Sequence, residues 1–302
     1  MGEFDLIARY FDREARQGIG DDCAVFTPTS GLQLCISSDM LVEGRHFFPD
    51  VSPEALGHKA LAVNLSDLAA CGAAPRAFTV ALALPKVDEV WLEAFSRGLF
   101  ALADQHNCLL IGGDTTKGPL NICMTVLGEV PMGQALLRSG AKVGDDIYVS
   151  GSVGEARLAL EVLRGNVTVQ ASTFNGARKH LERPTPRVAL GIALRGIATS
   201  AIDISDGLLG DLGHILKLSK VGATVQTGWI KGSLEYALAG GDDYELLFTA
   251  PAIKGDAVEA IAKQSSVQIT RIGRIEAEQG LRLVAPNGKP MTNTFVSFDH
   301  FA

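Results

Sequence analysis

Long apolar runs and an excess of positive charge are both missing from this sequence of 302 residues. No stretch reaches 18 uninterrupted apolar residues, which excludes an ordinary transmembrane helix. The chain carries 27 Lys and Arg against 34 Asp and Glu, a formal net charge of −7 at pH 7. That sign disfavours a surface that follows the phosphates of nucleic acid or an anionic membrane. The first residues are acidic and no apolar segment follows them, so we predict no signal peptide and a cytoplasmic protein.

Cysteine pairs and the common nucleotide-binding motifs are absent as well. The five cysteines are an odd number without any Cys-x-x-Cys spacing, which fits neither a disulfide framework nor a zinc knuckle. We therefore predict reduced thiols in apolar segments. The pair Gly288-Lys289 is followed by Pro290 and forms no Walker loop, and the His-Arg-Asp and Asp-Phe-Gly motifs of protein kinases are missing.

The length predicts two domains, and the pattern of the chain predicts their class. In the first half, strands expected at 23–26, 32–37, 77–84, 108–111 and 120–130 alternate with helices that begin at Pro53 and Asp88. The segment 131–145 has little periodicity and reads as a linker. The second half opens with a strand at 147–150, a glycine-rich turn and a helix. We predict two α/β or α+β domains, residues 1–135 and 136–302.

Glycine is abundant, and it gathers beside aspartate. The 33 glycines exceed the usual share of about 7%. Carboxylates next to glycine allow the backbone to approach a ligand closely while their oxygens face a hard cation such as Mg²⁺. Such an arrangement predicts phosphate binding bridged by Mg²⁺. Six short motifs have this character: Gly18-Ile19-Gly20-Asp21-Asp22, Ser37-Ser38-Asp39, Asn64-Leu65-Ser66-Asp67, Gly112-Gly113-Asp114, Asp203-Ile204-Ser205-Asp206-Gly207 and Gly240-Gly241-Asp242-Asp243.

Each motif taken alone also has an ordinary structural explanation. An Asp-Gly pair is common turn chemistry. Asp67 sits in the middle of an expected helix, where it either meets a ligand or occupies the solvent face. The turn from Gly151 to Gly154 either cradles an anion or simply joins a strand to a helix. Arg138 in the linker could pair with a phosphate or form an exposed salt bridge, and His46 lies on a loop where histidines are usually solvated.

Taken together, these motifs resemble the thiamine-monophosphate kinase family, which belongs to the superfamily of aminoimidazole ribonucleotide synthetase and selenophosphate synthetase. The resemblance covers nearly the whole chain. Its most specific part is the block from Lys59 to Ala70, Lys-Ala-Leu-Ala-Val-Asn-Leu-Ser-Asp-Leu-Ala-Ala, and it extends to Asp299-His300-Phe301. The family fold implies an N-terminal α/β domain whose strands form a β-barrel with those of a second subunit, a C-terminal α+β domain, and a homodimer.

The resemblance implies a function and a set of site residues. The function is ATP-dependent phosphorylation of thiamine monophosphate to thiamine diphosphate by direct in-line transfer with several Mg²⁺ ions. The implied metal ligands are Asp22, Ser38, Asp39, Asp67, Asp114, Asp203 and Asp206, of which Asp22, Asp67, Asp114 and Asp206 are also expected to be catalytic. ATP is expected to contact Gly112, Gly113, Asp114, Arg138 and Ser205, and the thiamine substrate His46, Asp242 and Phe298.

The chain departs from the family pattern at several places. Asp242 stands where the family usually has Glu, and Phe298 stands where related chains carry Tyr. The segments 16–18 and 227–233 look shorter than their counterparts. The alternatives are another ATP-dependent enzyme of the superfamily and a non-catalytic, metal-dependent nucleotide-binding protein. Cys23 is in the wrong setting for the reactive cysteine of selenophosphate synthetase, and the last residues lack the Pro-Arg-x-Cys tail of a hydrogenase-maturation protein.

Overall fold

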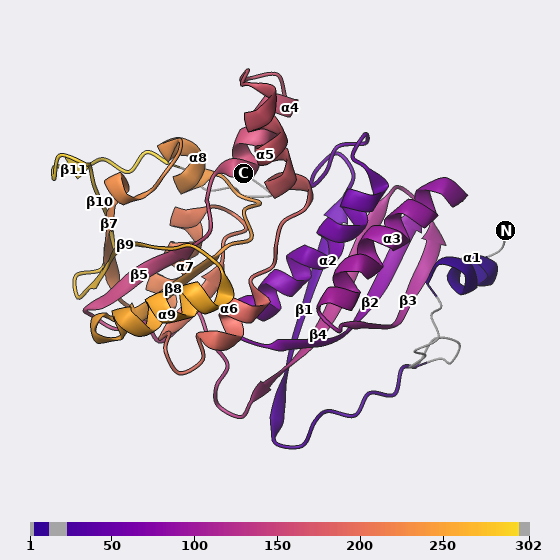
Figure 1. Cartoon of the computed structure of the whole chain (residues 1–302), viewed down its shortest axis with the longest axis horizontal. Coiled ribbons are helices and arrows are strands. Elements are labelled where there is room, and N and C mark those ends of the chain that lie inside the picture. Colours follow the sequence, from indigo (N-terminus) through magenta and orange to yellow (C-terminus); the bar gives the residue numbers. More distant parts are fainter. Residues whose placement is uncertain (1–2, 12–22, 296–302) are drawn as a thin grey trace. The chain divides into compact units, whose positions relative to one another are not determined.

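The computed structural model describes residues 3–11 and 23–295, and it divides the chain into two compact units (Figure 1). The N-terminal unit comprises Met1–Leu68 and Ala73–Gly133, and the C-terminal unit comprises Ala69–Gly72 and Gln134–Ala302. From the family resemblance we also expect residues 1–135 to form the domain that binds ATP and metal and forms the dimer, and this stays a prediction. Among the helices built from the described residues, none combines the length and the hydropathy needed to cross a membrane.

The N-terminal unit is a four-stranded sheet with helices against one face (Figure 1). Its strand order is β1-β4-β2-β3, in which only the β2–β3 pair is parallel. The elements are α1 (Glu3–Tyr10), β1 (Leu32–Val42), α2 (Pro53–Ala70), β2 (Ala74–Leu84), α3 (Glu89–Gln105), β3 (Leu109–Lys117) and β4 (Asn121–Pro131).

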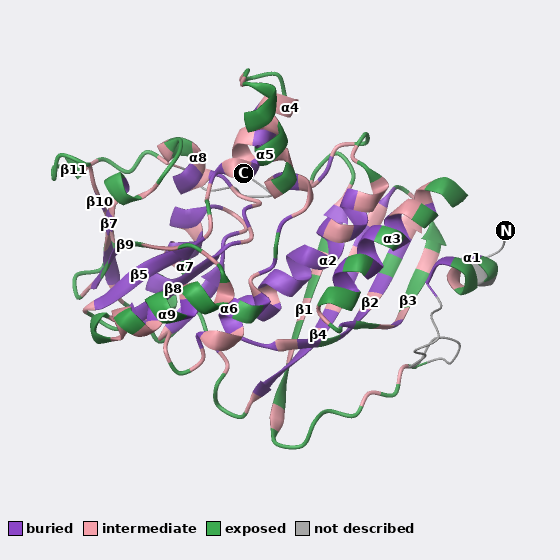
Figure 2. Ribbon diagram, viewed as in Figure 1, coloured by how far each residue is buried: buried purple, intermediate pink, exposed green. Residues whose placement is uncertain are grey.

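The two central helices of this unit form where the sequence predicts them. Asp88 caps α3, because its carboxylate accepts the N–H of Trp91 at 3.1 Å. Helices α2 and α3 approach each other backbone to backbone: a Cβ on Gly98 would lie 1.9 Å from the carbonyl oxygen of Glu54. Alternate residues of β2, such as Val80 and Leu82, are buried, whereas Ala81 between them is exposed (Figure 2). The sheet therefore has one face in the core and one open face.

The predicted strand at 23–26 is wrong. Residues 24–29 form no helix or strand, and the sheet begins only at Leu32. The end of this segment is tied to β4 through a side chain instead of a ladder: Glu129 accepts the backbone N–H and the hydroxyl of Thr29, both at 2.7 Å. The segment therefore meets the sheet through a carboxylate at Thr29, three residues beyond the apolar pattern at 23–26.

The C-terminal unit contains a seven-stranded mixed sheet in the order β11-β10-β7-β9-β5-β8-β6. Strand β5 is buried at all six positions and pairs with β8 on one side and β9 on the other. Tyr148 of β5 stacks on Phe248 of β8, with ring centroids 5.3 Å apart. The strands are β5 (Asp145–Ser150), β6 (Ser200–Asp203), β7 (Gly222–Gln226), β8 (Leu246–Pro251), β9 (Ile269–Glu276), β10 (Gly280–Val284) and β11 (Pro290–Met291).

Helices of the C-terminal unit place the loops that matter for the site. They are α4 (Glu155–Leu163), α5 (Ala171–Glu182), α6 (Val188–Ala193), α7 (Leu208–Ser219), α8 (Leu234–Ala239) and α9 (Gly255–Ser265), with short 3₁₀ turns η1 (Thr227–Trp229) and η2 (Ala252–Lys254). Buried leucines and isoleucines of α7 join the main core cluster with β5, β7 and β8. The loops that precede α4 and α7, and the loop that follows α8, carry the polar residues discussed next.

Candidate functional site

The N-terminal unit places two predicted metal ligands, Asp39 and Asp67, on the helix-facing side of its sheet. The hydroxyl of Ser37 donates to Oδ2 of Asp67 at 2.5 Å, which joins β1 to α2. The backbone N–H of Asp39 donates to Oδ1 of Asn64 at 3.1 Å, and Nδ2 of Asn64 donates to the carbonyl oxygen of Ala60. Asp67 is half-buried in a helix whose neighbouring positions are buried. It therefore belongs to a polar network at the β1–α2 junction and not to a freely solvated helix face.

Two other predicted ligands, Ser38 and Asp114, lie on the open face of the same sheet. Adjacent residues of a strand point to opposite faces, so Ser38 and Asp39 diverge. Ser38 donates to the carbonyl oxygen of Met124 at 2.9 Å and lies 3.0 Å from the hydroxyl of Thr125. Asp114 is exposed on β3, the edge strand opposite β1. Three strand spacings, roughly 14 Å along the sheet, separate these two edges.

Gly112 and Gly113, which are predicted to contact ATP, differ in how closely the rest of the sheet packs against them. A Cβ on Gly113 would lie 1.9 Å from the carbonyl oxygen of Val80, so the close approach of β2 requires glycine there. A Cβ on Gly112 would meet no atom within 4 Å. Packing therefore accounts for Gly113, whereas the missing side chain of Gly112 leaves open space beside the backbone.

His46 lies on a tight loop that fixes its ring. The loop reverses through Gly44, which has φ +76, and a bridge pairs Glu43 with Phe47. The backbone N–H of Val42 donates to Nδ1 of His46 at 3.0 Å. When the ring is neutral, Nδ1 is thus the acceptor and the proton resides on Nε2. The buried Lys59 ammonium donates to the carbonyl oxygen of His46 at 3.4 Å, which holds the same loop from α2.

In the C-terminal unit, the acidic motif before α7 and the motif after α8 lie against each other. The backbone N–H of Asp242 donates to the carbonyl oxygen of Ser205, and that of Tyr244 donates to Ile204, both at 2.9 Å. The structure therefore brings the predicted ATP residue Ser205 next to the predicted substrate residue Asp242. Asp203, at the end of β6, is buried, and Asp206 is half-buried.

Asp211, which sequence reasoning missed, shapes the first of these loops from within. Its Oδ2 accepts the backbone N–H groups of Ser205 at 3.1 Å and of Asp206 at 3.2 Å. Burial and then the negative charge of Asp206 raise the pKa of Asp211 to about 7, although these backbone N–H groups oppose the rise. A buried carboxylate is thus the internal support of the loop that carries Ser205 and Asp206.

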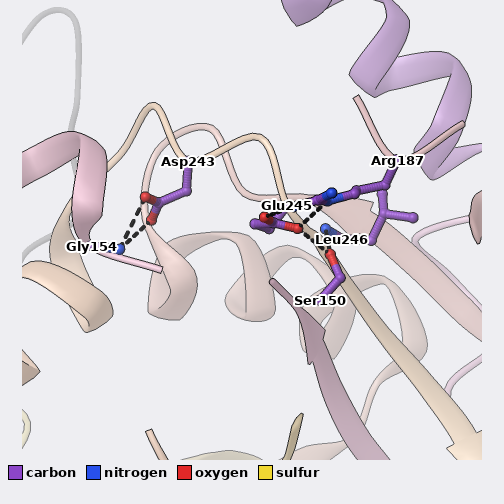
Figure 3. A network of polar contacts seen from close by, with 6 residues as sticks. All are labelled: Ser150, Gly154, Arg187, Asp243, Glu245 and Leu246. Carbon is purple, nitrogen blue, oxygen red and sulfur yellow. Dashed lines mark hydrogen bonds and ion pairs between the residues drawn. The ribbon is translucent and has the colours of Figure 1, made fainter. Parts of the chain in front are cut away.

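The hydrogen bonds of Asp243 show whether the glycine-rich turn before α4 is available to bind an external anion. Its carboxylate oxygens accept the backbone N–H of Gly154 at 3.0 and 2.8 Å, at the N-terminus of the helix (Figure 3). Burial raises the pKa of Asp243 well above its usual range, against the hydrogen bonds from Gly154 and Ala156. The alternative that this turn cradles an external anion is wrong at Gly154, because an internal carboxylate already takes that donor.

A second buried carboxylate, Glu245, has its own cluster of partners (Figure 3). It accepts the hydroxyl of Ser150 and both Nε and Nη2 of Arg187, with Nε at 2.7 Å. Ser150 in turn accepts the backbone N–H of Leu246 at 2.8 Å. Sequence reasoning did not single out Glu245, Arg187 or Ser150, since acids beyond the Gly-Gly-Asp-Asp motif carried no local signal.

The remaining predicted residues are placed only in part. Arg138 is exposed after the first unit, and its carbonyl oxygen accepts the Ser219 hydroxyl at 3.4 Å. Asp22 and Phe298 lie outside the described residues. Within residues 3–11 and 23–295, no group of three or more His, Cys, Asp or Glu side chains is placed to hold a metal ion by itself.

Comparison with known proteins defines first a class and then a family. The family model for the N-terminal domain of AIR synthase related proteins matches residues 20–130, and the model for the C-terminal domain matches residues 142–286. The chain thus has the two-domain organisation of AIR synthase related proteins. It is 48% identical to the thiamine-monophosphate kinase of Salmonella typhimurium over 322 aligned positions, which cover 100% of this chain and 98% of the relative.

Solved structures agree with this assignment. The crystal structure of thiamine-monophosphate kinase from Stenotrophomonas maltophilia matches with a TM-score of 0.85 at 44% identity, covering 95% of this chain and 96% of that one. A structure of AaThiL complexed with AMPPCP and TMP matches with a TM-score of 0.78 at 30% identity, covering 98% and 95%. The chain belongs to the thiamine-monophosphate kinase family. Because 322 aligned positions exceed its 302 residues, the alignment with the Salmonella kinase contains gaps in this chain.

Proposed function

We propose that this protein transfers the terminal phosphoryl group of ATP to the phosphate of thiamine monophosphate, which yields ADP and thiamine diphosphate. The observation that carries the proposal is the 48% identity to a thiamine-monophosphate kinase along the whole chain. A relative that is 30% identical to this chain was solved in complex with AMPPCP and TMP, which supports the same pair of substrates. Phosphoryl transfer requires positioning and charge neutralisation more than covalent catalysis, which suits a site of aspartates, glycines and backbone donors.

The residues present fit Mg²⁺ as the partner of the phosphates. The predicted ligands offer only carboxylate and hydroxyl oxygens, which are the donors that this ion prefers, and one or two carboxylates per ion suffice. Mg²⁺, when bound, would neutralise charge on the phosphate oxygens. Asp39 and Asp114 lie on opposite edges and opposite faces of one sheet, so a single ion cannot bridge them within that sheet. This geometry supports the proposal of several ions, held by Asp22, Ser38, Asp39, Asp67, Asp114, Asp203 and Asp206.

The local geometry of the residues predicted to contact ATP and thiamine monophosphate suits these two ligands. The open space at Gly112 permits a ligand to approach the backbone of β3, and the exposed Arg138 guanidinium suits a phosphate. The neutral His46 ring carries its proton on Nε2, because Nδ1 accepts the backbone N–H of Val42. Asp242 and Ser205 are hydrogen-bonded neighbours through their backbones. We propose Gly112, Gly113, Asp114, Arg138 and Ser205 for ATP, and His46, Asp242 and Phe298 for thiamine monophosphate.

We further propose that the protein works as a homodimer through the sheet of its N-terminal unit. The open face of edge strand β1 carries three exposed apolar side chains, Leu34, Ile36 and Met40, of which Ile36 is 62% exposed. An apolar sheet face and an edge strand both favour association with a second sheet. A barrel shared by two subunits would cover this face. The cytoplasmic location expected from the sequence remains a prediction.

A substrate screen tests the proposed function. The protein is incubated with ATP and Mg²⁺ together with thiamine monophosphate, thiamine, selenide or formylglycinamidine ribonucleotide, and ADP release is measured for each. We expect ADP release that depends on thiamine monophosphate alone. Release that depends on selenide or on the ribonucleotide would assign the chain to another reaction of its superfamily, and nucleotide binding without turnover of any acceptor would favour a non-catalytic role.

A further inference from the structure

The segment from Gly240 to Glu245 has an unusual backbone. Asp242 and Tyr244 have φ values of +68 and +51, in the left-handed region that residues with a side chain rarely adopt. Between them, Asp243 has no such conformation. Non-glycine residues stay in this region only when their surroundings over-determine the backbone, and such residues concentrate at functional sites. The surroundings that hold this segment can be identified.

Two buried carboxylates anchor the segment from its inner side (Figure 3). Asp243 is 5% exposed and binds the N–H of Gly154 at the start of α4. Glu245 is 2% exposed and binds Ser150 of β5 and Arg187, which precedes α6. The fit around Glu245 is tight, since a Cβ on Gly151 would lie 1.9 Å from its Oε1. The alternate residues Asp243 and Glu245 therefore fix the segment to three different elements.

The outer side of the segment carries the predicted substrate contact. The Tyr244 hydroxyl donates to Oδ1 of Asp242 at 3.0 Å, so the two left-handed residues are joined through their side chains. Their backbone N–H groups bind the carbonyl oxygens of Ser205 and Ile204. The side chain of Asp242 is short, with a single methylene between the backbone and the carboxylate. Its reach toward a substrate consequently depends more on where the backbone lies than on rotation of a long side chain.

We propose that Asp243 and Glu245, the latter through Arg187, are positioning residues that hold Asp242 and Tyr244 in place for the thiamine substrate. The inference rests on the proposed function and extends it to residues that do not themselves contact substrate. The inner anchors set the backbone of the Asp242–Tyr244 pair, and this backbone sets the position of the Asp242 carboxylate next to Ser205. Loss of the anchors should therefore weaken binding of thiamine monophosphate more than binding of ATP.

The test compares paired and unpaired changes at the Glu245 anchor. Arg187→Met alone leaves a buried carboxylate without its charged partner and is expected to fold poorly. The double variant Arg187→Met/Glu245→Gln removes both charges, and the glutamine oxygen can still accept the Ser150 hydroxyl. We expect this double variant to fold, with a KM for thiamine monophosphate raised roughly tenfold and a KM for ATP changed less than about twofold. Arg187→Lys with native Glu245 should recover part of the loss.

Asp146→Asn is the matched control. Asp146 is also a buried carboxylate of the C-terminal unit, paired with Arg271 and Arg274 of β9, and it lies at the opposite end of β5 from Ser150. We expect it to lower the melting temperature and leave both KM values unchanged. If the double variant behaves like this control, the anchors only stabilise the fold and the proposal is overturned.

Hydrogen exchange provides a readout that needs no catalysis. The backbone amides of Asp242 and Tyr244 should exchange faster in the double variant and stay protected in Asp146→Asn, because only the double variant removes an anchor of the segment. Unchanged protection at both amides would overturn the anchoring. If the wild-type protein does not phosphorylate thiamine monophosphate but these amides respond as expected, the proposed function and the substrate part of this inference are overturned together, and the anchoring stands. The two failures are therefore distinguishable.

Discussion

The two units of the molecule use their aspartates in different ways. In the N-terminal unit, the predicted ligands stand on regular elements, with Asp39 on β1, Asp67 on α2 and Asp114 on β3. In the C-terminal unit, Asp203 ends β6 and Asp206 lies on the loop that follows it. This loop and the loop of the predicted substrate contact Asp242 are held from inside by further carboxylates, Asp211 and Asp243. The first unit thus relies on strands and a helix to place its acids, whereas the second uses buried acids as parts of the scaffold.

The acidic residues that lie beside glycine therefore form two populations. The first consists of acids placed to hold a cation, and the second consists of buried acids that support the backbone from inside. Burial raises the pKa of Asp211 to about 7 and that of Asp243 well above its usual range, which marks them as internal groups that organise backbone N–H donors. A carboxylate that caps a helix or a loop looks the same in the sequence as one that holds a cation. Only the hydrogen-bond partners separate the two populations.

The largest expected effect belongs to the first population. Asp67→Asn should lower Mg²⁺-dependent turnover by roughly 100-fold or more, because it removes a charge at a predicted metal site while an amide oxygen can still accept the Ser37 hydroxyl. The measurement is the rate against Mg²⁺ concentration. Glu93→Gln, on the exposed side of α3, is the control and should have no effect. Full activity of the Asp67 variant at limiting Mg²⁺ would show that Asp67 is structural like Asp243.

A smaller effect is expected at Asp211, where hydrogen bonding and charge can be separated. The backbone N–H groups of Ser205 and Asp206 both reach Oδ2, and that of Gly207 also interacts with this carboxylate. An asparagine oxygen can still accept the bonds from Ser205 and Asp206. Asp211→Asn should retain most of the activity, whereas Asp211→Leu should raise the KM for ATP by about tenfold because the Ser205 loop loses its support. Equal losses in both variants, measured by steady-state kinetics, would mean that the charge itself acts at the site.

The adjacent glycines of β3 should separate packing from ligand access. Gly113→Ala would place a methyl group 1.9 Å from a backbone oxygen of β2, so we expect a loss of several degrees in melting temperature. Gly112→Ala meets open space, so its melting temperature should change by only a degree or two while its KM for ATP rises severalfold. A Gly112→Ala variant with an unchanged KM for ATP would remove this residue from the proposed nucleotide site.

The smallest effect is a pH dependence of opposite sign at two buried acids. The hydrogen bond from Asn166, together with Arg157 and Arg164, lowers the pKa of Glu161 against its burial. The stability that Glu161 contributes therefore exists above its ordinary pKa and is lost as pH falls through the lowered value. Asp243 has a raised pKa, so its ionisation destabilises the fold as pH rises above about 4.

The two acids can be compared in urea unfolding between pH 3 and 7. The stability deficit of Glu161→Gln relative to the wild type should shrink as pH falls. The deficit of Asp243→Asn should shrink as pH rises, because the asparagine avoids the cost of a buried charge. The same pH trend in both variants would contradict the assignment of Asp243 as a buried acid whose ionisation costs stability.

Much of the fold could be predicted from local pattern. The Asp88 cap, the apolar periodicity of α3 and the alternation in β2 follow directly from their residues. Strand β7 was missed, since five residues with a glycine give little signal, although β7 joins β10 to β9 in the middle of the sheet. The strand expected at 23–26 is absent, and its segment meets β4 only at Thr29, through the Glu129 side chain. Pairing across the sheet is not encoded locally.

The candidate site was predictable in its residues more than in its arrangement. The motif around Asp67 gave the family, but the sequence order of Asp39 and Asp114 says nothing about their opposite edges in the sheet. Alternation along a strand does predict that Ser38 and Asp39 face apart. The roles of Asp211, Asp243 and Glu245 depend on loops that fold onto each other, with partners 5 to 95 residues away in the chain. No local pattern carries such information.

The most direct test of the account is the stoichiometry of phosphoryl transfer, followed by ³¹P NMR with ATP, Mg²⁺ and thiamine monophosphate. If the proposed transfer is right, the monophosphate resonance of the thiamine substrate is replaced by the two coupled resonances of thiamine diphosphate, and one ADP forms for each diphosphate. ADP that accumulates at the same rate without thiamine monophosphate, or a thiamine phosphate resonance that does not change, would contradict it.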